Sequence, residues 1–202
     1  MRRDTTATER VAAFSDAVIA VIITIMVLDL KAPEDPKLTA ILALWPTLLS
    51  YVVSYLFIAI IWINHHHLLH FVRVASPRLL WINFAHLFFV SLLPFATAWM
   101  ARTELAPLPV AIYAATFVLV NGAYLFFERE AFKQADPSLL SAHARRLARR
   151  RSFVGLAIFA LAALVALVKP FLGFGLICTA LVLYLRPELF TRRHTEPQGD
   201  LQ

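Results

Sequence analysis

Four groups of polar side chains interrupt the apolar segments of this 202-residue chain, and their residue types could do chemistry. An ionisable group inside a long apolar segment is costly, so Asp16 needs a specific reason to be there. Carboxylates and imidazoles can bind cations, transfer protons or hydrogen-bond one another. The four groups are Asp16 with Arg10 and Ser15, then His65, His66, His67 and His70 with Trp62 and Asn64, then Asn83 with His86, and finally Asn121.

Three interpretations of the first three groups are open from the residues alone. The first is structural, because a carboxylate, a guanidinium and imidazoles that hydrogen-bond one another would pin helices together. The second is metal binding, since His66 and His70 share one helical face and Asp16 could complete the ligand set. The third is proton relay or pH sensing. Adjacent histidines on a helix diverge by about 100°, so residues 65–67 cannot all reach one ion.

Catalysis has little support in the sequence. It contains no hydrolase motif, no Gly-rich phosphate-binding loop and no candidate cysteine nucleophile. The single cysteine, Cys178, lies in an apolar run, which excludes an intramolecular disulfide and a cysteine-based metal site. We therefore predict that the protein is not an enzyme and holds no cofactor.

Composition places the chain in the membrane class. Apolar residues make up 60% of it, charged residues make up 16%, and the mean hydropathy is +0.70. A soluble helical protein would show polar faces at a 3.6-residue period, whereas the long segments here are apolar all round. The net charge of +6 comes without a basic stretch with interleaved aromatic residues, so no nucleic-acid surface is predicted.

At about 20 apolar residues per crossing, the sequence predicts an all-α membrane protein with six transmembrane helices. Of the Lys and Arg residues in the connections, 15 fall on one side of the membrane and four on the other. Because positive residues favour the cytoplasmic side, both termini are predicted to be cytoplasmic. Pro94 lies inside a span, where it should kink the helix or free a carbonyl group. The predicted spans are 11–30, 45–71, 79–100, 110–132, 153–168 and 171–185.

The predicted organisation has three parts: a cytoplasmic N-terminus (1–10), a six-helix channel domain (11–186) and a disordered cytoplasmic tail (187–202). The connection 133–151 is basic, with five arginines in residues 145–151. It is either an amphipathic helix lying on anionic lipids or a solvated loop that fixes the topology. The fifth span is rich in glycine and alanine, which predicts close helix packing.

The first span has two distinct faces. At 100° per residue, Asp16 points about 140° away from Val21, which lies on an apolar face with Ala17, Thr24, Ile25 and Leu28. One face can therefore join the polar cluster while the other meets something else. That second face is either packed core or, in an assembly of copies, the lining of a pore that gates by dewetting.

Motifs in the first three spans are similar to those of a known family. Arg10-x-x-x-Phe14-Ser15-Asp16, followed by Thr24 and by Val27-Leu28-Asp29-Leu30, resembles the first-helix signature of the transmembrane protein 175 family of potassium channels. Further motifs that resemble the family are Trp62-x-x-His65-His66, Leu80-Trp81-Ile82-Asn83 and Leu93-Pro94-Phe95. A single six-helix repeat makes the chain similar to the prokaryotic branch, and its last three spans agree only in layout.

The resemblance implies a homotetramer in which the first helices line a central pore. It implies that Val21 forms the constriction, Thr24 a hydroxyl layer, and Ile25 and Leu28 further apolar layers. Asp29 would lie near the outer mouth, either concentrating cations or as a plain helix-end carboxylate. It also implies a structural network that braces the pore helix, made of Arg10, Phe14, Ser15, Asp16, Trp62, His65 or His66, and Asn83.

We therefore expect a homotetrameric, potassium-permeable channel of a bacterial cytoplasmic membrane. Its partners would be copies of itself, anionic lipids at residues 145–151, and K⁺ or other monovalent cations. The permeant K⁺ takes the place of a cofactor, and no bound metal is expected. The alternative is a secondary transporter or metal-handling protein that uses Asp16 and the histidines of the second span, and a third possibility is a membrane scaffold without transport activity.

Overall fold

The computed structural model describes residues 3–72, 74–134 and 142–190, and its regular elements are all α-helices. Long apolar runs form helices because a helix satisfies every internal backbone hydrogen bond within one segment. The helices are α1 (Arg3–Val27), α2 (Leu38–Ala43), α3 (Trp45–His70), α4 (Pro77–Ser91), α5 (Leu93–Arg102), α6 (Pro107–Gln134), α7 (Ala142–Ala166) and α8 (Pro170–Phe190).

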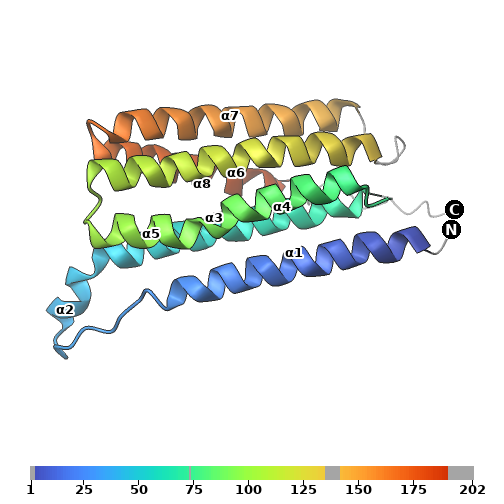
Figure 1. Cartoon of the computed structure of the whole chain (residues 1–202). Helices are drawn as coiled ribbons and strands as arrows, with labels where there is room; N and C mark the ends of the chain where they lie inside the picture. Colours follow the sequence, from blue (N-terminus) through green and yellow to red (C-terminus); the bar gives the residue numbers. More distant parts are fainter. Residues whose placement is uncertain (1–2, 73, 135–141, 191–202) are drawn as a thin grey trace, which may run out of the picture.

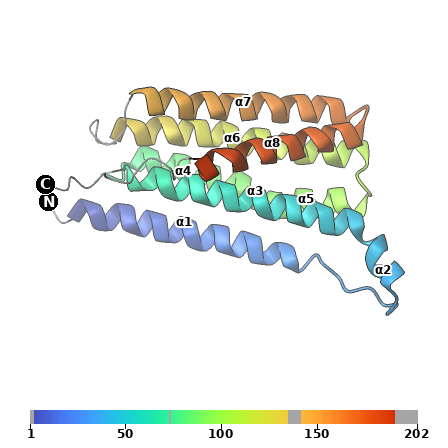
Figure 2. The ribbon, with the colours of Figure 1, turned by 180° about the vertical axis from the view of Figure 1, so that it is seen from behind.

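The long helices lie side by side in one bundle, with α7 along one side and α1 along the opposite side (Figure 1). α6 lies between α7 and the α4 and α5 helices, and it contacts α3, α4, α5, α7 and α8. The view from behind shows α8 running back along the bundle, where it contacts α3, α6 and α7 (Figure 2). α1 contacts α3, α4 and α5, and α2 projects beyond one end.

Basic side chains divide between the two ends of the bundle as the sequence predicts. Arg10, Arg78 and Lys133 belong to helix ends that meet where α1 and α7 begin, and the arginines of residues 145–151 are at this end too (Figure 1). Arg102 and Lys169 belong to the opposite end. The assignment of the arginine-rich end to the cytoplasm remains a prediction.

Four helical segments in the described part of the chain are long and apolar enough to cross a membrane. They are Ala7–Val27, Trp45–His70, Pro77–Arg102 and Pro107–Gln134, and Pro170–Leu185 is a shorter apolar helix. The class prediction of an all-helical membrane protein is therefore confirmed. Crossings by α7 and α8, and hence the count of six spans, remain predictions.

The third predicted span is broken into α4 and α5, as Pro94 suggested. Proline lacks a backbone N–H, and its ring crowds the preceding helical turn. α4 ends at Ser91, and α5 begins at Leu93 with Pro94 in its first turn. Leu92 between them keeps right-handed helical angles (φ −82°, ψ −14°), so the two pieces continue in one direction. The helix is thus interrupted beside Pro94, while the predicted kink or free carbonyl group stays a prediction.

Several boundaries differ from those expected. α1 begins at Arg3 within the predicted N-terminal segment, and the unpredicted α2 precedes α3. α8 continues to Phe190, so the predicted tail begins inside a helix, and residues 191–202 lie outside the described chain. The basic residues 142–151 are continuous with the fifth span in α7, not a separate surface helix or a loop, while residues 135–141 are outside the described ranges.

The small residues of α7 allow the close packing that the sequence predicts. A Cβ added to Gly155 would overlap the Tyr184 hydroxyl, and one added to Gly173 would lie 2.6 Å from the Ala166 Cβ. Such distances leave room only for hydrogen, so α7 and α8 approach closely at both ends of their contact. Ala162 and Ala166 are fully buried between them.

Candidate functional site

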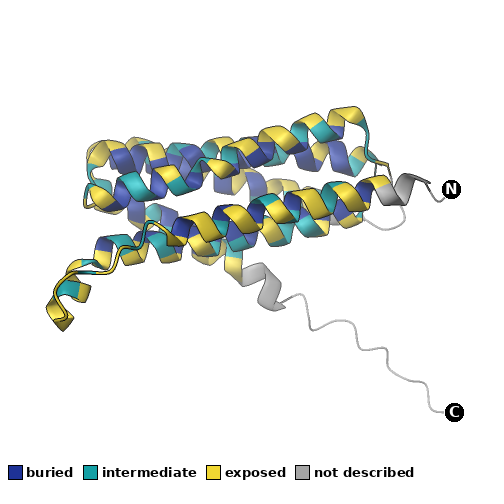
Figure 3. Cartoon of the chain, turned by 60° about the horizontal axis from the view of Figure 1, so that its bottom comes forward, coloured by how far each residue is buried: buried dark blue, intermediate teal, exposed yellow. Residues whose placement is uncertain are grey.

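α1 is divided lengthwise into a packed face and an open face. Ile19, Ile22 and Met26 are buried in the main hydrophobic core. On the other side, Val21 is 54% exposed and Leu28 is 75% exposed, and Ala17, Thr24 and Ile25 are also exposed. Figure 3 shows this open face as a line of exposed residues along α1. The open face contains every residue that we expected to line a pore.

Thr24 is the polar member of the open face. Its hydroxyl donates a hydrogen bond of 2.9 Å to the carbonyl oxygen of Val21. A hydroxyl has one proton, so this bond leaves only the lone pairs of Thr24 Oγ1 free to meet a ligand. Thr24 Oγ1 can therefore accept a hydrogen bond or coordinate a cation.

A buried chain of hydrogen bonds ties α1 to α4 and α3. The Asn83 carboxamide Nδ2 donates to Ser15 Oγ at 2.9 Å, and its Oδ1 lies 2.7 Å from His65 Nε2. His65 and Ser15 are fully buried, and Asn83 is nearly so. Each buried side chain in this chain finds a hydrogen-bond partner in a low-dielectric interior. The bonds therefore hold the three helices in register.

Asp16 forms a second, more open contact with α3. Its Oδ1 accepts a hydrogen bond of 2.8 Å from Trp62 Nε1, and its Oδ2 lies 3.8 Å from His66 Nδ1. The Trp62 and His66 rings are stacked with centroids 5.3 Å apart. Sequence reasoning left open which histidine joins the network. Both do, His65 through Asn83 and His66 beside Asp16.

Arg10 does not pair with Asp16 as the sequence suggested. Arg10 is exposed, and among the described residues no ion pair of Asp16 other than that with His66 occurs within 4.0 Å. The guanidinium lies nearly two helical turns before Asp16 and stays in solvent, where an arginine needs no partner. Asp16 is satisfied by the indole N–H instead.

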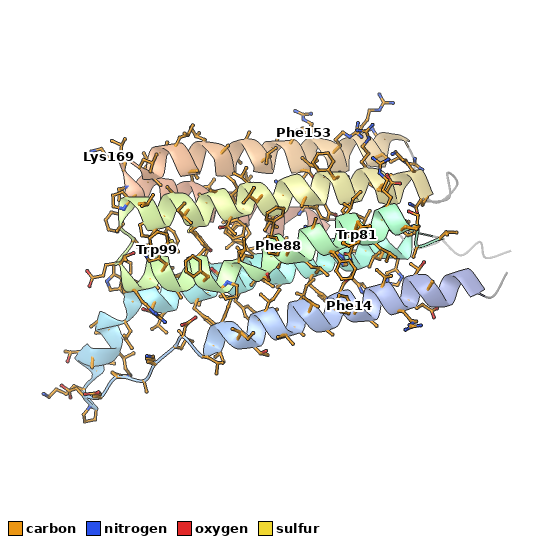
Figure 4. All side chains as sticks on the ribbon, in the orientation of Figure 1. Phe14, Trp81, Phe88, Trp99, Phe153 and Lys169 are labelled. Carbon is orange, nitrogen blue, oxygen red and sulfur yellow. The ribbon has the colours of Figure 1, made fainter. Side chains whose placement is uncertain are left out.

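Phe14 joins α1 to the aromatic surface of α4. Its ring meets Phe84 edge-on, with centroids 5.5 Å apart, and both rings are about half exposed. The Phe84 ring also lies 6.3 Å from that of Trp81, which is 76% exposed and is labelled with Phe14 in Figure 4. Phe14 is therefore part of an open aromatic surface that adjoins the polar network.

His86 and Asn121 lie apart from Asp16. His86 Nδ1 is 3.3 Å from the Val120 carbonyl oxygen, and its ring stacks with that of His65 at 5.9 Å. Asn121 Nδ2 donates to the Ser152 carbonyl oxygen at 3.0 Å and so connects α6 to α7. Both residues serve as buried ties between helices. The described residues contain no group of three or more His, Cys, Asp or Glu side chains able to hold a metal ion.

Sequence reasoning missed two polar links at the other end of the bundle. Ser54 Oγ lies 2.8 Å from Thr97 Oγ1 and 2.7 Å from the Tyr113 hydroxyl, a buried contact that joins α3, α5 and α6. Asp29, next to the end of α1, accepts a 2.8 Å hydrogen bond from Arg102 Nη2 of α5. A lone hydroxyl in an apolar run is too common a feature to mark such a contact, and the pairing of Asp29 depends on tertiary structure.

These features define a helical membrane protein whose first helix is fixed by a polar network on one side and left open on the other. The family described as "Endosomal/lysosomal potassium channel TMEM175" matches residues 10–94, which include both faces of α1 and the polar network. A potassium channel of Chryseobacterium sp. (strain P1-3) is 31% identical over 180 residues, covering 89% of this chain and 93% of that protein. The chain belongs to the TMEM175 family.

Relatives that match over shorter stretches agree with this assignment. A potassium channel of Streptomyces collinus is 39% identical over 97 residues, or 46% of this chain and 47% of that protein. Mouse TMEM175, named an endosomal/lysosomal proton channel, is 35% identical over 100 residues, which are 20% of its length. The crystal structure of a lysosomal potassium-selective channel TMEM175 homolog from Chamaesiphon minutus has the same fold, with a TM-score of 0.79, 24% identity and coverage of 89% of this chain and 97% of that chain.

Proposed function

We propose that the protein is a potassium-permeable channel, formed by four copies of the chain, whose pore is lined by the open face of α1. The observation that carries this proposal is the contrast between the two sides of α1. Val21, Ile25 and Leu28 are left uncovered by the subunit, while Ile19 and Met26 opposite them are packed. An apolar helix face that is left uncovered by its own subunit must contact either lipid or other copies of the subunit.

The composition of the open face supports a pore. Val21, Ile25 and Leu28 would form apolar rings, and such rings gate ion passage by expelling water from a narrow channel. Thr24 adds a ring of hydroxyl oxygens whose protons are already donated to the backbone. Such a ring favours cations over anions. The potassium selectivity of this chain is proposed from the names of its bacterial relatives.

The remaining residues would act in support. Ser15, Asp16, Trp62, His65 and Asn83 would hold α1 at a fixed distance from the pore axis, with Phe14 and Arg10 at the edge of the network. The arginines of α7 would lie against anionic lipids of a bacterial cytoplasmic membrane, with both termini in the cytoplasm. No relative supports the alternative of a transporter or metal-handling protein, because the named relatives are channels.

The test is single-channel recording of the purified chain in a planar bilayer under a K⁺ gradient. We expect discrete current steps, and Val21→Asn should raise the open probability or leak because a polar ring keeps the constriction wet. Val182→Asn on α8 is the matched control, since it makes the same change at a position of similar exposure (49%). The absence of current steps, or equal effects of the two variants, would contradict the proposal.

A further inference from the structure

Two histidines outside the hydrogen-bond chain lie unusually close together. His66 and His70 are one turn apart on α3, and their Nε2 atoms are 2.9 Å from each other. The two rings meet edge-on, with centroids 4.5 Å apart. In the absence of an ion, a single proton shared between the two nitrogens accounts for this distance. When that proton moves to His70 Nδ1, the Nε2 lone pairs of both rings are free and could bind one metal ion.

Asp16 orients His66 for this second role. His66 Nδ1 is buried without a hydrogen-bond partner in the described chain, and the Asp16 Oδ2 lies 3.8 Å from it, within the range of an electrostatic contact. A carboxylate on that side favours the tautomer with the proton on Nδ1, which leaves the Nε2 lone pair directed toward His70. A carboxylate behind an imidazole is the arrangement that orients many metal-binding histidines. The Trp62 indole keeps that carboxylate in place.

The two imidazoles open onto a groove between α1 and α3. The groove has a volume of about 210 Å³, and Thr8 and Glu9 of α1 line its opposite wall. Thr8 is 8% exposed, and its Oγ1 has no hydrogen-bond partner in the described chain. The groove has room for several water molecules, and the hydroxyl of Thr8 is free to bind one of them. Water can therefore supply the remaining ligands of an ion.

We propose that His66 and His70 bind one Cu²⁺ ion, or Ni²⁺ more weakly, in this groove. The ligand type favours this metal. Imidazole nitrogens suit Cu²⁺ and Ni²⁺, and among divalent first-row ions the affinity of a nitrogen site is highest for Cu²⁺. The 2.9 Å separation shows that the two nitrogens can approach closely enough to share one ion.

This inference does not depend on ion conduction, and it connects a metal site to the proposed pore helix through one carboxylate. Both ligands are on α3, but the group that orients His66 is Asp16 of α1, five residues before Val21. A metal ion that binds His66 restricts the motion of its ring. It therefore also stabilises the contact between α3 and the proposed pore helix.

The experiment titrates the purified full chain, without a polyhistidine tag, with Cu²⁺ and follows tryptophan fluorescence. Trp62 is stacked on His66, so bound Cu²⁺ should quench one of the four tryptophans in a saturable way at one ion per chain. His70→Ala should raise the half-saturating Cu²⁺ concentration at least about tenfold, because loss of even an outer-sphere partner has an effect of that size. Substituting Zn²⁺ should give weaker binding than Cu²⁺.

His67→Ala is the matched control, since His67 is exposed and adjacent but its side chain points about 100° away on the helix. It should bind Cu²⁺ as tightly as the unchanged chain. Electron paramagnetic resonance of the bound Cu²⁺ gives an independent measurement, with hyperfine splitting expected from two imidazole nitrogens. No saturable quenching, equal affinity in His70→Ala, or a spectrum with fewer than two nitrogens would overturn the proposal.

Discussion

α1 and α6 are similarly apolar, yet they are buried within the subunit to very different extents. Both are long and apolar enough to cross a membrane, but 22% of the apolar stretch of α1 is buried within the subunit compared with 50% of that of α6. α6 packs against α3, α4, α5, α7 and α8, while α1 packs on one side and leaves its other side open. Hydropathy therefore identifies both as membrane helices, and only packing separates the helix that holds the subunit together from the one offered to a neighbour.

The largest expected effect lies on α6. Phe117 is 2% exposed and packs against Phe57 and Phe159, with ring centroids 4.5 Å and 5.1 Å away. Phe117→Ala should lower the free energy of unfolding by about 3–5 kcal/mol, because it leaves a cavity in the core. Chemical unfolding in detergent measures this effect. Phe171→Ala at an exposed site on α8 is the control, and an equal loss in both variants would contradict the comparison.

The next largest effect lies in the network that attaches α1. Asn83→Ala removes one side chain but leaves both Ser15 and His65, which are fully buried, without their hydrogen-bond partner. We expect a loss of about 1–3 kcal/mol for each polar group that remains unpaired. Asn64→Ala is the control, because the carbonyl oxygen of Asn64, and not its carboxamide, accepts the bond from Tyr124. Similar melting temperatures for the two variants would mean that the network does not hold α1.

A smaller effect is expected for the ion pair between Asp29 and Arg102. Both side chains are partly exposed, at 34% and 69%, so water competes with the 2.8 Å contact. A double-mutant cycle with Asp29→Asn and Arg102→Gln should give a coupling energy of less than about 1 kcal/mol. A coupling above that range would indicate that the site is dry in the assembled protein.

The smallest effect on stability is expected on the open face of α1. Val21→Ala should change the free energy of unfolding by less than about 0.5 kcal/mol, because a side chain that faces a pore loses no packing partner. Thermal unfolding of the assembled protein is the measurement. A loss above about 1 kcal/mol would show that this face packs against protein, as a core valine does.

The sequence predicted the helices well because long apolar segments leave the backbone few alternatives in a membrane. Pro94 marked the break between α4 and α5, and the 100° periodicity placed Val21 and Asp16 on different sides of α1. The periodicity could not show which of these sides the subunit covers, because that depends on neighbouring helices. α2 was missed because six residues carry too weak a periodic signal.

The polar site was predicted in its members and not in its contacts. Ser15, Asn83 and His65 were recognisable because polar groups are rare in apolar segments. The partner of Asp16 was mistaken, since charge favoured Arg10 whereas the fold brings the indole of Trp62 within 2.8 Å. The contact of Ser54 with Thr97 and Tyr113 was missed because its hydroxyls look ordinary in a helix. Residue type locates candidate polar groups, while helix packing selects which of them meet.

The bond from Asn83 to Ser15 joins residues 68 positions apart in the chain. While the protein is being synthesised, the first helix enters the membrane well before α4 exists. Until then, neither Ser15 nor His65 has its native partner in Asn83, although α1 and α3 are already present. The Asp16–Trp62 bond can join α1 to α3 at that stage, but the buried hydrogen bonds that hold α1, α3 and α4 in register must wait until α4 has been synthesised.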